Sequence, residues 1–225
     1  MRALVFDTST IISLSTNDLL WILKLLKEKF KGDFLISDAV KEELIDYPLK
    51  TKKFKFEAII ISNLLNNNYL RIYSSKEINE KINYLDNLIN TTFKAKGDYI
   101  KIMHKGEIGS LAVAILLNTD AYAVDERTTR LLIEDPDRLA RILRNKLHTT
   151  VNVNKNNLDI LKKEVKNIKV LRSTELALIG YELGLFSDFL KSSSKKDLID
   201  GLLWGLKLRG CSITDNEISE ALKIY

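Results

Sequence analysis

The chain has 225 residues, of which 45% are hydrophobic and 29% are charged, and its formal net charge is +5. This length and apolar content suffice for one large domain with a substantial core. A single cysteine, Cys211, excludes an internal disulfide, and no apolar run approaches the roughly 18 residues that a membrane span needs. We therefore expect a cytoplasmic protein without a membrane anchor, and its positive charge mildly favours a polyanionic partner.

The first predicted strand is the apolar run from Ala3 to Phe6, which Asp7 follows directly. A run that is apolar on both faces is typical of a central strand in a parallel sheet with helices above and below. Ligands of α/β proteins bind at the carboxyl ends of such strands, so Asp7 is a candidate for chemistry. The alternative is that Asp7 caps the next helix, and this stretch alone does not distinguish the two.

Strands and helices alternate along the rest of the chain, which predicts a parallel sheet with helices on both faces. The expected helices are residues 15–32, 38–47, 49–65, 76–93, 106–118 and 127–147. The strands expected after the first are residues 34–36, 69–73, 121–124 and 168–171, with an Asn-rich turn between 147 and 168.

Four acids share a position relative to this sheet. Asp7 and Asp125 each directly follow a strand. Glu43 lies in the helix that leaves the second strand, and Glu107 lies in the first turn of helix 106–118, along its apolar face. Carboxylates that converge on one pocket repel each other unless a cation is bound or protons are retained. Mg²⁺ and Mn²⁺ prefer oxygen ligands, so the set predicts a metal site of the nuclease type.

The order of these segments resembles the PIN-domain nuclease family. The stretches FDTSTIISL, ISDAVKEEL, HKGEIGSLAVAI and YAVDERTTR carry the four acids, and KVLRSTELALIGYELGLF resembles the final strand and helix of that fold. The resemblance implies a three-layer α/β/α sandwich, an acidic Mg²⁺ or Mn²⁺ site and hydrolysis of phosphodiester bonds, usually in RNA. Carried over by position, the site residues are Asp7, Glu43, Glu107 and Asp125, with Ser9 as the hydroxyl beside the first acid and Thr174 or Ser173 at the edge of the last strand.

Two segments are longer than in the compact toxin members of that family, which predicts helical insertions near residues 49–100 and 135–166. We expect residues 1–190 to form the PIN-like domain and residues 191–225 to form a helical extension packed on it. The last helices include Trp204 and several leucines, a pattern that indicates core packing or a contact in a homodimer.

Arginines are frequent after Asp125. Some of them recur near one helix face, where a phosphate backbone would find them, although interleaved acids fit an ordinary solvated face equally well. The expected nucleic-acid contacts are Arg127, Arg130, Arg138, Arg141 and Thr174.

Together these features predict a metal-dependent endoribonuclease. One alternative is a DNA-directed, flap-type nuclease that uses the same site, and another is a non-catalytic RNA-binding subunit with the same fold. A third is metal-free RNA cleavage by His104 and His148, which nothing in the sequence places together. Phosphatases of the haloacid dehalogenase type also begin with a strand running into Asp, but they need an acid where this chain has Ser9.

Overall fold

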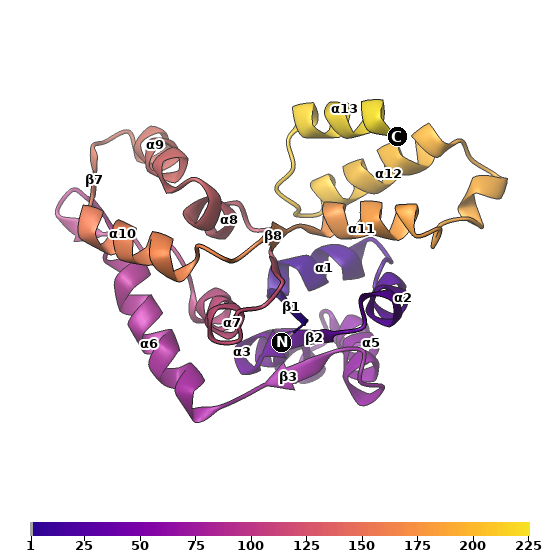
Figure 1. The fold of residues 1–225 in the computed structure, drawn as a ribbon, viewed down its shortest axis with the longest axis horizontal. Helices are drawn as coiled ribbons and strands as arrows, with labels where there is room; N and C mark the ends of the chain where they lie inside the picture. Colours follow the sequence, from indigo (N-terminus) through magenta and orange to yellow (C-terminus); the bar gives the residue numbers. More distant parts are fainter. Residues whose placement is uncertain (1) are drawn as a thin grey trace.

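The computed structural model describes residues 2–225, and at its centre lies a five-stranded parallel sheet (Figure 1). The strand order is β3–β2–β1–β6–β8. These strands are β1 (Ala3–Phe6), β2 (Asp33–Ser37), β3 (Arg71–Tyr73), β6 (Ala121–Ala123) and β8 (Val170–Leu171). β1 is central, with Val5 opposite Leu35 on one side and Tyr122 on the other. Because every pairing in this sheet is parallel, the carboxyl ends of all five strands lie along one edge.

Alternate side chains of the sheet enter two separate cores. Leu4 and Phe6 pack into one core, and Ala3 and Val5 pack into the other, because successive strand residues point to opposite faces. The helices of the Leu4–Phe6 core are α1 (Thr8–Thr16), α2 (Trp21–Phe30), α3 (Asp38–Lys41), α5 (Lys55–Asn66), α11 (Ser173–Glu182), α12 (Lys195–Leu208) and α13 (Asp215–Ile224). The helices of the Ala3–Val5 core are α6 (Lys76–Asn90), α7 (Lys105–Leu116), α8 (Arg127–Glu134), α9 (Pro136–Leu147) and α10 (Lys155–Glu164). The expected three-layer α/β/α sandwich is confirmed.

The first helices differ from the expectation. Asp7 caps α1, a helix that was not expected as a separate element, and α2 begins at Trp21 instead of near Ser15. Residues 38–49 run from α3 through a π-helical turn, η1 (Glu42–Asp46), into α4 (Tyr47–Leu49). Residues 49–65, expected as one helix, contain a loop between α4 and α5. π-helical turns are rare and are frequently found at functional sites.

The segments far from the sheet edge also differ from those expected from the sequence. Residues 127–147, expected as one helix, form α8 and α9 because Asp135 caps α9 and Pro136 opens it. Residues 147–168, expected as a turn, contain β7 (Val151–Val153) and α10. β7 pairs antiparallel with β4 (Phe93–Ala95), which also pairs with β5 (Asp98–Tyr99). This second sheet ends the helix expected at 76–93 early, at Asn90.

The C-terminal segment shares the core of the sheet. Leu203 of α12 and Ile218 of α13 belong to the same buried cluster as Phe6. A short 3₁₀ turn, η2 (Phe189–Lys191), connects α11 to α12, and Figure 1 shows α11, α12 and α13 gathered on one side of the sheet, opposite α6, α9 and α10. Among residues 2–225, no helix combines the length and the apolar character needed to cross a bilayer.

Candidate active site

Asp7 is a buried carboxylate with one satisfied oxygen. The backbone N–H and the hydroxyl of Ser9 donate to Asp7 Oδ2 at 3.0 and 2.6 Å. Asp7 Oδ1 accepts no hydrogen bond of ordinary geometry among residues 2–225, although the side chain is only 1% exposed. The pKa of the Tyr122 hydroxyl is raised by burial, and this hydroxyl is close enough for the Asp7 charge to add to the shift. Burial raises the pKa of Asp7; the hydrogen bonds from Ser9 act against this shift, and the charge of Glu43 adds to it.

Glu43 approaches the same edge from the π-helical turn. Thr8 Oγ1, the residue after Asp7, donates to Glu43 Oε2 at 2.6 Å. The Glu43 carboxylate lies against the start of α7, where a Cβ added to Gly106 would come within 2.6 Å of Glu43 Oε1. Glycine at this position therefore leaves the space that the carboxylate uses. The π-helical turn carries Glu43, and not its neighbour Glu42, to this contact with Thr8 and Gly106.

Glu107 comes from the first turn of α7. Its Oε2 accepts a hydrogen bond from the His104 backbone N–H at 2.6 Å, which caps the helix. Burial raises the pKa of Glu107 to about 7; the His104 hydrogen bond opposes this shift, and the charges of Asp7, Glu126 and Glu43 add to it. These three acids are thus its electrostatic neighbours. The Tyr122 hydroxyl of β6 donates to the Glu107 carbonyl at 3.5 Å, and burial together with the charges of Asp7 and Glu107 raises the pKa of Tyr122.

Glu126 is the acid that the sequence interpretation missed. Its charge raises the pKa of Glu107, and its Oε2 caps α8 by accepting from the Thr129 N–H at 2.6 Å. The local signal was its place directly after Asp125, at the end of the strand. Which of two neighbouring acids faces the edge depends on the backbone turn into α8.

Asp125, expected as a metal ligand, has a carboxylate that is engaged in internal hydrogen bonds. It is 0% exposed, and both of its carboxylate oxygens are occupied: Ser173 donates to Oδ1 through its N–H at 2.7 Å and to Oδ2 through its hydroxyl at 2.6 Å. Burial raises the pKa of Asp125, and the hydrogen bonds from Ser13 and Ser173 lower it. In this structure Asp125 is a buried acceptor that ties β6 to α11, and its role as a metal ligand stays a prediction.

Ser9 connects the two aspartates. Its hydroxyl donates to Asp7 Oδ2 and accepts from the Asp125 backbone N–H at 3.1 Å. Its side chain is thereby fixed on both sides, which indicates a positioning role for Ser9 in place of a catalytic one.

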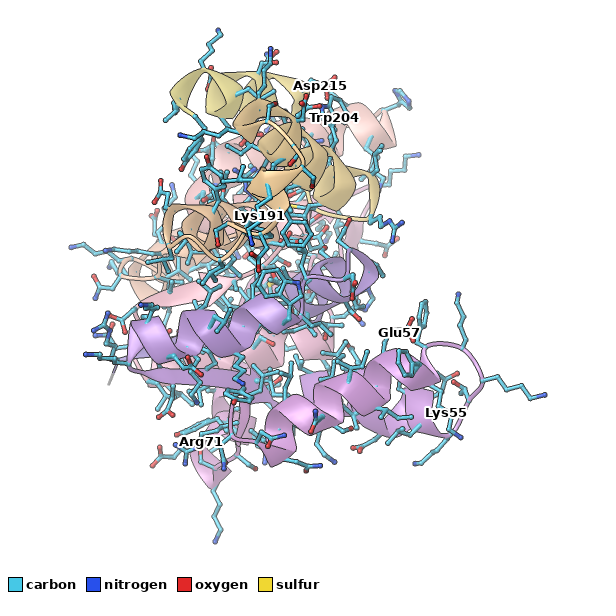
Figure 2. The ribbon with its side chains drawn as sticks, turned by 90° about the vertical axis from the view of Figure 1, so that its right-hand side faces the viewer. Lys55, Glu57, Arg71, Lys191, Trp204 and Asp215 are labelled. Atoms are coloured by element: carbon cyan, nitrogen blue, oxygen red, sulfur yellow. The ribbon has the colours of Figure 1, made fainter. Side chains whose placement is uncertain are left out.

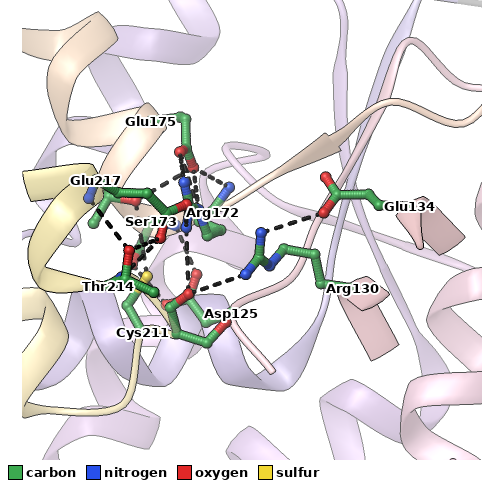
Figure 3. Close-up of polar contacts among 11 residues, drawn as sticks. Asp125, Arg130, Glu134, Arg172, Ser173, Glu175, Cys211, Thr214 and Glu217 are labelled. Carbon is green, nitrogen blue, oxygen red and sulfur yellow. Dashed lines mark hydrogen bonds and ion pairs between the residues drawn. The ribbon is translucent and has the colours of Figure 1, made fainter. Parts of the chain in front are cut away.

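A polar network extends from Asp125 to the C-terminal segment (Figure 3). The Ser212 N–H donates to the Asp125 carbonyl at 3.1 Å, and Arg172 Nη1 donates to the Ser212 carbonyl at 3.3 Å and to Glu217 at 2.8 Å. Arg172 also pairs with Glu175. The network holds the loop before α13 against the end of β6.

The expected nucleic-acid residues fall into three environments. Thr174 is 0% exposed and lies beside Cys211, so its assignment as a nucleic-acid contact is wrong. Arg130 is turned inward, toward Glu134 at 3.2 Å and the Ser212 carbonyl at 3.3 Å. Arg127, Arg138 and Arg141 are exposed, and the first two line a groove with Arg130 and Thr214.

The two histidines lie on different elements. His104 precedes α7 and His148 follows α9, and no hydrogen bond joins their side chains among the described residues. Paired imidazole catalysis therefore receives no support from their placement.

The acids at this edge of the sheet have the donor chemistry of a cation site but not, as they stand, its close spacing. Within residues 2–225, no three His, Cys, Asp or Glu side chains are close enough to hold one ion as they stand. The donor chemistry nevertheless fits a hard cation, which prefers carboxylate oxygens. In each of four acids, the hydrogen bonds described above use only one of the two oxygens; these acids are Asp7, Glu43, Glu107 and Glu126. The unpartnered, buried Asp7 Oδ1 is the strongest feature of this fit. Glu43 is exposed, and Glu107 and Glu126 are half-buried.

No family model, curated protein or solved structure matches this chain.

Proposed function

We propose that the chain is a metal-dependent endoribonuclease whose active site is the acidic edge formed by Asp7, Glu43 and Glu107, with Glu126 beside them. The observation that carries this proposal is Asp7, whose buried Oδ1 has no partner. An uncompensated buried carboxylate is costly, and three further acids nearby increase the cost unless a cation or a proton is present. The order of the motifs, which resembles that of PIN-domain nucleases, supports the same function.

Asp7, Glu43 and Glu107 would hold Mg²⁺ or Mn²⁺, since both ions prefer oxygen ligands. A bound ion would stabilise negative charge on the phosphate and make a water molecule more acidic. The chain's own contribution is orientation. Ser9 fixes the rotamer of Asp7, and Thr8 holds Glu43 at the start of α7. The buried Tyr122 and the apolar core close the site from below.

The decisive experiment is cleavage of a 5′-labelled RNA in Mg²⁺ or Mn²⁺ and in EDTA. We expect EDTA to stop cleavage, either ion to restore it, and the products to carry 5′-phosphate ends. The Asp7→Asn variant, purified in parallel, controls for contaminating ribonucleases.

Other outcomes identify other functions. Cleavage that resists EDTA and leaves 2′,3′-cyclic phosphate would contradict the proposal and indicate histidine chemistry. Preference for a deoxy flap substrate would indicate the DNA-directed alternative. Salt-sensitive RNA binding without any cleavage would indicate a binding subunit. Sedimentation of the same sample shows whether the chain forms a homodimer.

A further inference from the structure

An exposed, basic and aromatic segment lies beside the acidic edge. Residues 47–56, YPLKTKKFKF, run from α4 through the loop into the first turn of α5, and we call them the arm. Figure 2 shows the beginning of α5, marked by Lys55 and Glu57, projecting beyond the rest of the molecule. Nothing in the active site described above uses the arm.

Three aromatic rings of the arm are exposed to solvent. Tyr47 is 68% exposed, Phe54 is 49% exposed and Phe56 is 71% exposed. Single exposed apolar residues are common on protein surfaces, but three exposed aromatic residues within ten positions of one segment favour a contact surface.

The arm is also strongly cationic. It contains Lys50, Lys52, Lys53 and Lys55 and has no acid between Asp46 and Glu57. None of the ion pairs among residues 2–225 involves these four lysines. Lys53 Nζ lies 4.8 Å from the centre of the Phe54 ring, so an aromatic ring and an ammonium group lie side by side on this surface.

The backbone of the arm is held by hydrogen bonds and includes one residue with a positive φ. Thr51 Oγ1 donates to the carbonyls of Pro48 at 3.1 Å and Lys53 at 3.0 Å. Phe54 has φ +60°, in the left-handed region that bulky side chains rarely adopt. Strain of this kind persists where the surroundings enforce it, and it is concentrated at functional positions.

The arm is continuous with the active site. Phe54 and Glu43 line one pocket, together with Ile12. Tyr47 lines a second groove with Glu43 and Gly106. Glu43 therefore lines pockets in common with two of the exposed aromatic residues of the arm.

We propose that the arm binds single-stranded nucleic acid and leads the strand to Glu43. Unpaired bases would stack on Tyr47, Phe54 and Phe56, while the lysines contact phosphates. Stacking on side chains requires bases that are free of a duplex, and it tolerates any sequence because every base has a flat face. That the strand is RNA and is then cut rests on the proposed function, whereas binding by the arm does not.

The test measures binding without cleavage. Fluorescence anisotropy of a labelled 12-nucleotide oligouridylate is recorded in EDTA, with an oligodeoxythymidylate and a blunt 12-base-pair duplex of mixed sequence as comparison ligands. Replacing both Tyr47→Leu and Phe56→Leu should weaken single-strand binding about 5- to 100-fold, because each stacked base contributes appreciably. The variants Lys52→Gln and Lys53→Gln, combined, should lower the salt slope of binding by about 1.4, since each phosphate contact on a single strand contributes about 0.7.

The chain supplies a matched control. Tyr99 is 58% exposed and lies under Lys94 at 5.3 Å, but it belongs to the small second sheet, which includes β7, on the side of the molecule away from α5 (Figure 1). Tyr99→Leu and Lys94→Gln should leave binding unchanged. Circular dichroism melting verifies that each variant folds.

Three results would overturn the proposal. These are single-strand binding that the arm variants do not change, equal affinity for the duplex, and an arm variant that alters sedimentation without altering oligonucleotide binding. The last result would identify a protein contact surface instead. Because EDTA removes cleavage from the measurement, a protein that binds but never cuts would refute the endoribonuclease and leave the arm intact.

Discussion

At the scale of single residues, Asp7 caps a helix and also keeps a carboxylate oxygen available for the proposed cation. It caps α1 by accepting the Ser9 N–H, and its other oxygen remains buried without a partner. The cap uses Oδ2 alone. Capping therefore does not exclude a role for Oδ1 in holding a cation.

Replacing Asp7→Asn tests the second role while keeping the first. Asn caps helices about as well as Asp, so α1 should be retained. RNA cleavage should fall by more than about 100-fold, because even changes behind a metal ligand cost 10- to 100-fold. Without metal at pH 8, removal of the buried charge should raise the free energy of unfolding by about 1–3 kcal/mol. Cleavage assays and urea unfolding measure the two effects.

The comparison variant is Asp7→Ala, which also loses the cap. Its free energy of unfolding should be about 1 kcal/mol lower than that of the Asn variant. Unchanged cleavage in the Asn variant would remove Asp7 from the site. A clear loss of stability on the Asn substitution would contradict a net cost of the buried charge, and equal stability of the Asn and Ala variants would show that the cap contributes little.

Glu107 should make the metal-free protein less stable as pH rises. Its pKa is about 7 in the folded chain and 4.5 for the unperturbed side chain, so the folded state binds the extra proton. The cost of ionising it is absent below pH 4.5, grows between pH 4.5 and 7, and is complete above pH 7. We expect about 1–3 kcal/mol after screening by solvent.

Urea unfolding at pH 5 and pH 8 measures this slope. Glu107→Gln should flatten it, and added Mg²⁺ should restore stability at pH 8 in the parent chain only, because ion binding requires the deprotonated carboxylate. A slope that is the same in the Gln variant would assign the pH dependence to other groups.

At the scale of elements, the site depends on how closely the start of α7 approaches the π-helical turn. Gly106→Ala would put a Cβ within 2.6 Å of Glu43 Oε1, and the flexible carboxylate would move away at little cost to the fold. We expect the melting temperature to be retained. Cleavage should fall about 10- to 100-fold, because a small misplacement of a catalytic group lowers the rate by this order.

The matched control for this element is Gly201→Ala in α12. A Cβ there meets nothing within 4 Å, so the change should stabilise the helix by about 0.5–1 kcal/mol and leave cleavage unaltered. Equal effects of the two substitutions on cleavage would show that Glu43 is not displaced or not required.

At the scale of the whole molecule, Arg172 joins the end of β8 to α13. Its side chain is 11% exposed and pairs with Glu217. Burial alone would raise the pKa of Glu217, but hydrogen bonds from Thr214 and Arg172 lower it to about 2. The stabilisation from this carboxylate is thus present above pH 4.5 and is lost as the pH falls toward 2.

Arg172→Leu should destabilise the protein by about 2–4 kcal/mol, because it leaves Glu175 and Glu217 without their partner in a partly buried place. Residues 191–225 should become more sensitive to limited proteolysis. Lys191→Ala removes an ion pair with Asp188 in which both side chains are largely exposed, and it should cost less than about 0.5 kcal/mol. Similar losses in the two variants would argue against a structural role for the Arg172 network.

The sequence by itself determined the α/β class, the central strand and the positions of Asp7 and Glu107, because hydrophobic periodicity and a charge after a buried strand are local signals. It did not determine the second sheet, since β4 and β7 pair across a long stretch of chain. Nor did it determine which acid of Asp125 and Glu126 faces Glu107, or that Thr174 is buried. Only the tertiary structure decided these points, because side-chain direction at a strand end depends on the turn that follows it and on the α11 and C-terminal contacts that surround it.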